Sequence, residues 1–135
     1  MSSFLDSSFV VRYLTGDPPE LAERAAEIID KKQGHLVTDL VLAETAYVLT
    51  SLYQLPRPVV VDHLLAFMQK YNVAPFGLDK DTVLQALLLC RASARVSFAD
   101  SLIWAAARSS RNTVVYAFDT RFPEDGVEVR RAGVE

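Results

Sequence analysis

Short apolar stretches alternate with helix-length segments along this chain, and this order constrains the fold more than any other feature. Extended segments are predicted at residues 2–5, 35–38, 73–76 and 113–118, with a further short edge strand at 127–129. Parallel strands need crossover connections long enough to hold a helix. The order therefore predicts an α/β fold in which helices cover both faces of a central, mostly parallel sheet, as in a three-layer sandwich.

The intervening segments carry apolar residues at helical spacing. Helices are predicted after Asp6, at Glu20–Lys32 (closed by Gly34), at Leu40–Tyr53, at Val59–Tyr71, after Asp79 or Asp81, and after Ser97.

Length and composition predict one soluble domain spanning residues 1–135. The longest apolar runs, 86–90 and 102–107, fall far short of the ~20 residues that span a bilayer, and the N-terminus lacks a signal-type segment. The single cysteine, Cys90, lies among apolar residues and fits the core. We therefore expect a cytoplasmic protein without a membrane partner.

The net charge of −3 argues against a protein that grips a long duplex over its whole surface. It does not exclude a nucleic acid bound at one site. Basic residues that could flank such a site locally are Arg108, Arg111 and Arg121, or Arg130 with Arg131.

Acids follow three of the predicted strands. Asp6 leaves the first strand, Asp39 follows the second, and Asp119 ends the run at 113–118. In open α/β sheets, ligands bind at the carboxyl ends of the strands. Asp6 is therefore either a helix cap or a ligand, whereas Asp39 resembles an N-cap more than a ligand.

Two further acids lie within helices. Glu44 shares a helical face with residues that we expect to be buried, namely Leu40, Val41, Tyr47 and Val48. Either a base or a metal therefore compensates its charge, or it reaches water at the rim. Asp100 lies three residues after Ser97, as in a capping box, but it also shares a face with Trp104.

Asp6, Glu44, Asp100 and Asp119 are all expected near the same end of the sheet. Four converging carboxylates repel one another, so a cation is needed. The sequence offers no histidine or cysteine cluster for zinc, and carboxylates alone suit Mg²⁺ or Mn²⁺.

At this point the sequence resembles the PIN-domain ribonucleases, and among them the VapC-like toxins of toxin–antitoxin pairs. The resemblance spans essentially the whole chain and rests on four segments, which are 4–8 (FLDSS), 38–44 (TDLVLAE), 98–103 (FADSLI) and 116–122 (YAFDTRF). It implies a PIN-like fold, Mg²⁺ or Mn²⁺ held by the same four acids, and endonucleolytic cleavage of RNA. It also implies a homodimer inhibited by a small antitoxin.

Two positions depart from the family pattern. Members often have asparagine where this chain has Ser8, and threonine where it has Ala117. Neither change removes a carboxylate, but the second removes a hydroxyl near the metal.

In the mechanism that we expect, a metal ion is bound by Asp6, Glu44 and Asp100. Asp119 either completes a second metal site or holds a metal-bound water. Arg121 or Arg108 would then stabilise the charge that develops on the phosphate.

Rival functions are a phosphoacceptor signalling domain, an Asp-x-Asp phosphatase, and a non-catalytic PIN-like module that binds RNA or protein. A signalling domain usually shows adjacent acids after its first strand, which Asp6 lacks, and position 8 is serine where the phosphatase needs an acid. The non-catalytic module keeps the fold, but the presence of all four acids argues against it, and a metal titration would separate it from the nuclease.

Overall fold

The computed structural model describes residues 2–31, 33–111 and 114–131. The chain divides into two compact units, residues 1–76 and 77–135. Unit 1 contains β1 (Ser2–Phe4), α1 (Ser7–Thr15), α2 (Pro19–Ile29), β2 (Gly34–Val37), α3 (Asp39–Ser51), α4 (Arg57–Met68) and β3 (Val73–Pro75). Unit 2 contains α5 (Lys80–Ala92), α6 (Phe98–Ser110), β4 (Val114–Tyr116) and β5 (Glu128–Arg130).

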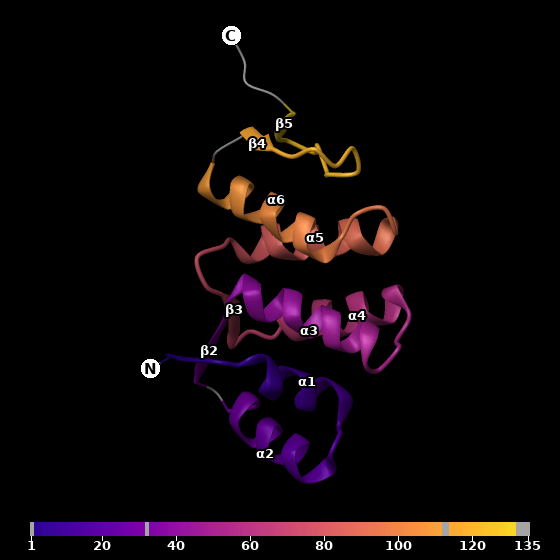
Figure 1. The fold of residues 1–135 in the computed structure, drawn as a ribbon. Coiled ribbons are helices and arrows are strands. Elements are labelled where there is room, and N and C mark those ends of the chain that lie inside the picture. Colours follow the sequence, from indigo (N-terminus) through magenta and orange to yellow (C-terminus); the bar gives the residue numbers. More distant parts are fainter. Residues whose placement is uncertain (1, 32, 112–113, 132–135) are drawn as a thin grey trace. The chain divides into compact units, whose positions relative to one another are not determined.

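Unit 1 is built on a parallel sheet of strand order β1-β2-β3 (Figure 1). Leu36 of β2 pairs with Phe4 on one side and Ala74 on the other. Pro75 lies in the edge strand β3, where a residue without an N–H group is tolerated. The predicted edge strand at 73–76 and the parallel pairing are therefore confirmed.

The helices of unit 1 bury one apolar stripe each. In α4, this stripe is at most 1% exposed and consists of Val60, Leu64, Phe67 and Met68. Tyr71, the last residue of the predicted helix, lies beyond α4 and is 79% exposed. Fully burying side chains of this size contributes roughly 1.5–3 kcal/mol each, so this stripe is a main source of stability in unit 1.

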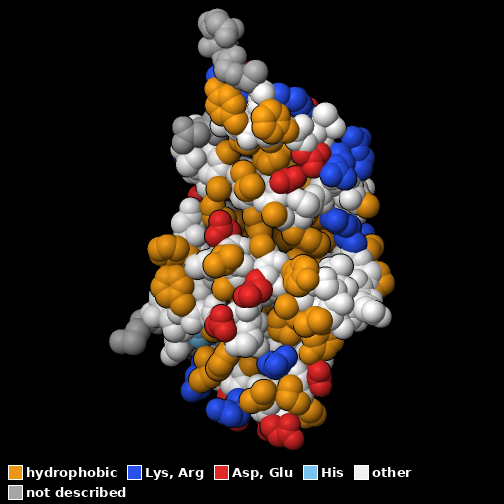
Figure 2. All heavy atoms as spheres, in the orientation of Figure 1, with side chains coloured by type: hydrophobic (Ala, Val, Ile, Leu, Met, Phe, Trp, Pro, Cys, Tyr) orange, Lys and Arg blue, Asp and Glu red, His pale blue; other side chains and the backbone are white. Residues whose placement is uncertain are grey.

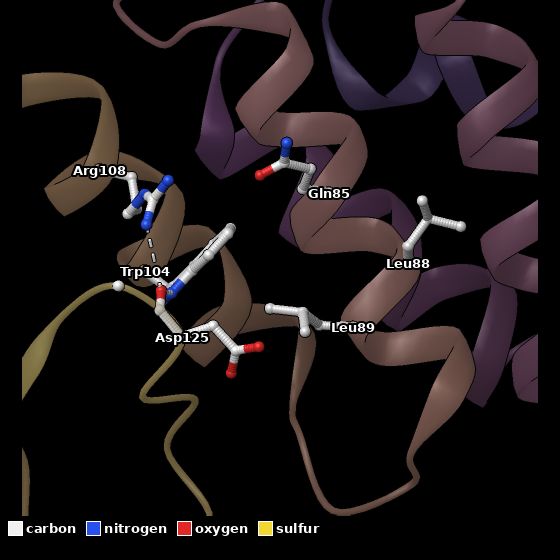
Figure 3. Close-up of a pocket in the computed structure, with 7 residues that line it drawn as sticks. Gln85, Leu88, Leu89, Trp104, Arg108 and Asp125 are labelled. Atoms are coloured by element: carbon white, nitrogen blue, oxygen red, sulfur yellow. Dashed lines mark hydrogen bonds between the residues drawn. The ribbon is translucent and has the colours of Figure 1, made fainter.

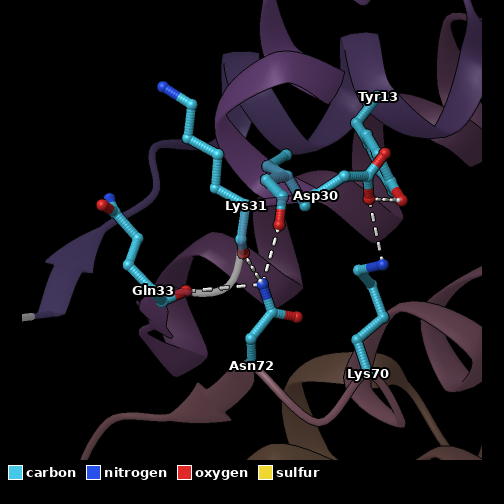
Figure 4. Close-up of polar contacts among 7 residues, drawn as sticks. Tyr13, Asp30, Lys31, Gln33, Lys70 and Asn72 are labelled. Carbon is cyan, nitrogen blue, oxygen red and sulfur yellow. Dashed lines mark hydrogen bonds and ion pairs between the residues drawn. The ribbon is translucent and has the colours of Figure 1, made fainter.

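The side-chain amide of Asn72 ties the α2–β2 connection to the start of β3 (Figure 4). Asn72 is 7% exposed, and its Nδ2 donates to the carbonyl oxygens of Ile29 at 2.8 Å and Lys31 at 2.6 Å. Beside it, Asp30 accepts hydrogen bonds from the Tyr13 hydroxyl and from Lys70. The Tyr13 hydroxyl is the main cause that lowers the pKa of the Asp30 carboxyl.

Unit 2 packs α5 against α6, and the parallel pair β4–β5 follows (Figure 1). Its core contains Ala86, Trp104, Ala105, Phe122 and Val127. Trp104 Nε1 donates to the backbone oxygen of Asp125 at 2.8 Å, which satisfies the polar atom of a buried ring.

Cys90 is fully buried, as predicted for a core residue. In the described part of the chain, no helix is long and apolar enough to cross a membrane.

Several element boundaries differ from the predictions. Gly34 begins β2 instead of closing α2, and the predicted helix end at Lys32 lies outside the described residues. Arg57 and Pro58 belong to the first turn of α4, where proline is favoured because its missing N–H needs no partner.

The run at 113–118 is not a strand buried on both faces. Only Val114–Tyr116 form β4, Tyr116 is 62% exposed, and Thr113 lies outside the described residues. Phe118 is 86% exposed as well, so an apolar sequence does not ensure that both faces of a segment are covered.

Candidate active site

Asp6 lies directly beyond β1, at the N-cap position of α1. The hydroxyl of Ser8 donates to Asp6 Oδ2 at 2.8 Å. This bond, together with the backbone amides of Ser7 and Ser8, lowers the pKa of the Asp6 carboxyl. Asp6 is thus an exposed carboxylate at the carboxyl end of a parallel strand, as predicted.

Glu44 reaches the same end of α1 from α3. The hydroxyl of Ser7 donates to Glu44 Oε1 at 2.5 Å, across 37 positions of sequence. Neighbouring serines therefore hold Asp6 and Glu44 beside the first turn of α1. The bond from Ser7 could not be predicted from the local sequence, because Glu44 lies 37 positions away along the chain.

The expectation that the neighbours of Glu44 at helical spacing are buried is confirmed for Val41, which is 9% exposed, but not for Leu40 or Tyr47. Leu40 and Tyr47, which share its face, are 74% and 68% exposed, and Glu44 is exposed as well. Helical spacing places these residues on one side, but other elements of unit 1 cover the opposite side, which carries Leu42 and Leu49. Glu44 thus lies at the rim in contact with water, where its carboxylate is accessible to a cation.

Asp39 does not cap α3. Its predecessor Thr38 is the N-cap, and Thr38 Oγ1 accepts a hydrogen bond from the amide of Val41 at 3.1 Å. Asp39 instead accepts from the amide of Leu40 in the first turn. Both residue types favour the cap, and the backbone position at which the helix starts decides between them.

In unit 2, Asp100 lies half-buried in the first turn of α6. Ser97 caps this helix, and its hydroxyl accepts a hydrogen bond from the amide of Asp100 at 3.0 Å. The serine half of the predicted capping box is therefore confirmed. Because Asp100 contributes its backbone amide to this bond, its carboxylate takes no part in the cap.

Asp119 follows β4 and forms a bidentate ion pair with Arg121. Arg121 Nε and Nη2 each lie 3.0 Å from an Asp119 oxygen, and the Arg121 amide donates to Oδ1 at 2.8 Å. The Arg121 side chain and amide lower the Asp119 pKa to about 2, with a smaller contribution from the charge of Arg95. In turn, Asp119 and, more weakly, Asp100 raise the pKa of Arg121.

The four acids thus form two pairs, one in each unit. Asp6 and Glu44 flank the start of α1, and Asp100 and Asp119 share Arg121 as a neighbour. Among the described residues of either unit, no three His, Cys, Asp or Glu side chains gather into a metal-binding group. All four offer carboxylate oxygen, the donor that Mg²⁺ and Mn²⁺ favour, so the donor chemistry fits such a metal.

The two departures from the family pattern have distinct structural settings. Ser8 supplies the hydroxyl that binds Asp6. Ala117 packs its methyl group against the core of unit 2, and its amide donates to the backbone oxygen of Arg130.

Two of the other candidate arginines are engaged elsewhere in unit 2. The Arg108 guanidinium lies 5.5 Å from the centre of the Trp104 ring and donates to the backbone oxygen of Asp125 (Figure 3). Arg130 pairs with Glu128. On the face drawn in Figure 2, Lys and Arg side chains lie in small groups between hydrophobic and acidic ones.

Comparison with known proteins identifies the class to which this fold and these acids belong. The family model of the PIN domain matches residues 3–126, and the chain therefore belongs to the PIN domain family. PIN domains have a nuclease-type fold and are often metal-dependent ribonucleases, which supports a hydrolase acting on nucleic acid. No curated protein matches the chain.

Proposed function

We propose that this protein is a Mg²⁺- or Mn²⁺-dependent endoribonuclease that hydrolyses RNA phosphodiester bonds, with Asp6, Glu44, Asp100 and Asp119 as its metal ligands. The observation that carries the proposal is the pair of serine hydrogen bonds that hold Asp6 and Glu44 at the carboxyl end of β1. Ligands bind at this end of the strands in open α/β sheets.

The charge state of the acids supports this role. The pKa values of Asp6 and Asp119 are lowered, so both side chains are ionised oxygen donors at neutral pH. Asp6 is held by Ser8 and Glu44 by Ser7, which reduces the side-chain freedom that binding a cation must restrict. A divalent metal, when bound, lowers the pKa of a water molecule and offsets negative charge on the phosphate.

The test is cleavage of a mixed RNA pool by the purified protein with Mg²⁺ or Mn²⁺, with chelator, and with Asp100→Asn. This variant keeps the backbone amide that Ser97 caps and removes one charge. We expect a folded protein whose metal-dependent cleavage is at least about 100-fold slower. Full activity of the variant would exclude Asp100 as a ligand.

The matched control is Asp81→Asn. Asp81 lies in the first turn of α5, as Asp100 does in α6, so the control removes a helix-terminal acid that has no proposed ligand role. We expect it to cleave RNA at the wild-type rate.

The second candidate function is a non-catalytic PIN-like module that binds RNA or protein. The observation that favours it is the Arg121 ion pair, because Arg121 engages both carboxylate oxygens of Asp119. Calorimetric titration with Mn²⁺ distinguishes the two functions, since the module is expected to bind no metal.

The same proposal includes a VapC-like toxin role in the cytoplasm, as a homodimer inhibited by an antitoxin. Exposed apolar side chains in unit 1 support a protein partner. Phe4 and Phe76 pack edge to face with ring centres 5.1 Å apart while more than half of each is exposed. Light scattering of the purified protein tests the dimer, and a monomer at micromolar concentration would contradict it.

A further inference from the structure

A hollow of about 190 Å³ lies in unit 2 between the loop before α6 and the segment that follows Asp119. It is lined by Ser93, Arg95, Val96, Thr120, Arg121, Phe122 and Glu124. Val96 and Phe122 are buried and form an apolar base, whereas both guanidinium groups belong to exposed residues. Two arginines and two hydroxyl residues thus surround one small cavity.

Asp119 orients the Arg121 side chain but uses only some of its N–H donors. A guanidinium has five N–H donors, and one bond from Nε and one from Nη2 go to Asp119. The remaining donors belong to the same side chain that lines the hollow. Because the ion pair fixes the plane of the guanidinium, binding a second anion costs less side-chain entropy.

Arg95 supplies a second cation. Within the described residues its side chain makes no hydrogen bond or ion pair, and its charge contributes to the lowered pKa of Asp119. The hydroxyl of Ser93 accepts from the Arg95 amide at 3.1 Å, so its own proton can be donated to a ligand. The helix α6 begins three residues after Arg95, and its N-terminus adds a favourable potential for an anion.

Glu124 also lines the hollow and opposes an anion. Removing the charge of an arginine in the lining should therefore weaken anion binding, whereas removing the charge of Glu124 should strengthen it.

We propose that this hollow binds one phosphate group of the RNA strand, with Arg95 and Arg121 as the phosphate contacts. The proposal rests on the RNA substrate of the proposed function and names the residues that position it. Guanidinium groups pair with phosphate oxygens in a bidentate manner, and Asp119, a proposed metal ligand, is bonded to one of them. A phosphate held here lies next to the acids of unit 2.

The test measures binding of a short fluorescein-labelled 2′-O-methyl RNA by polarisation, in chelator, where metal-dependent cleavage does not occur. Arg95→Gln is expected to weaken binding at least about fivefold at low salt. It also lowers the slope of log K against log salt by about 0.7, the value for one phosphate contact on a single strand. Arg95→Lys retains the slope, and Glu124→Gln tightens binding by about twofold or more.

The matched control is Arg24→Gln, which removes the same charge from an exposed residue of α2 in unit 1 that does not line the hollow. Wild-type affinity and slope are expected for it, and unchanged melting temperatures verify that the variants fold.

Equal affinities and slopes for Arg95→Gln and Arg24→Gln would overturn the phosphate site. That result is independent of the cleavage assay, in which wild-type protein without metal-dependent cleavage counts against the proposed function instead.

Discussion

At the scale of single residues, the ion pair between Asp119 and Arg121 determines the charge state of the fourth acid. The effect of this ion pair on stability depends on pH. A carboxyl whose pKa is lower in the folded state than in the unfolded state stabilises the fold above its unfolded pKa. For Asp119 this contribution is present above the ordinary value of 3.8 and is lost as the pH falls toward about 2. At neutral pH both partners are charged, and the pair is intact.

Replacing Arg121 by Gln tests this account. The variant lacks the guanidinium that is the main cause of the lowered pKa, so the Asp119 pKa is expected to rise from about 2 toward 3.8. Carboxyl ¹³C NMR shifts followed over a pH series report the titration of this side chain. Arg130→Gln, which removes the partner of Glu128, serves as the control. An Asp119 pKa that stays near 2 in Arg121→Gln would refute the assigned cause.

At the scale of elements, the amide of Asn72 connects segments that are distant in sequence. It donates to carbonyl groups at the end of α2 and in the connection to β2. A buried polar group without a partner costs about 1–3 kcal/mol. The position of β2, and with it the end of the sheet where Asp6 and Glu44 lie, depends on this residue.

Asn72→Ala is therefore expected to lower the free energy of unfolding by about 1–3 kcal/mol. Asn72→Asp keeps the shape of the side chain but replaces the donor by a buried carboxylate that faces carbonyl oxygens. We therefore expect it to lower the free energy of unfolding more than Asn72→Ala does. Urea denaturation measures both, and Gln69→Ala on the exposed side of the same segment is the control. If Asn72→Ala unfolds at the wild-type urea concentration, the amide does not secure the connection.

At the scale of the whole molecule, the proposed metal binding predicts an effect on stability. A ligand that binds only the folded state stabilises it by about 2.7 kcal/mol at 100 times its Kd. Metal ions should therefore raise the melting temperature even when no RNA is present.

We expect Mn²⁺ or Mg²⁺ to raise the melting temperature of the wild type, chelator to reverse the rise, and Asp6→Asn to abolish most of it. Differential scanning calorimetry measures these shifts. Glu27→Gln removes an exposed acid of α2 and should respond to metal like the wild type. A rise in Asp6→Asn that equals that of the wild type would exclude Asp6 as a ligand.

The match to the PIN domain and the parallel strands confirm the α/β fold predicted from the sequence. Local signals sufficed for this, because helical spacing and the serine cap at Ser97 act within a few residues. The site of Asp6 at a strand end was predictable for the same reason. The single domain and the four-acid metal site stay predictions.

Tertiary structure alone decided which faces are covered and which side chains meet. Periodicity groups Glu44 with Leu40 and Tyr47, but only the packing of unit 1 leaves that face in water. The bond from Ser7 to Glu44 and the hollow beside Arg95 each join segments separated in the chain. Such contacts depend on where the backbone carries each side chain, which spacing within one segment does not encode.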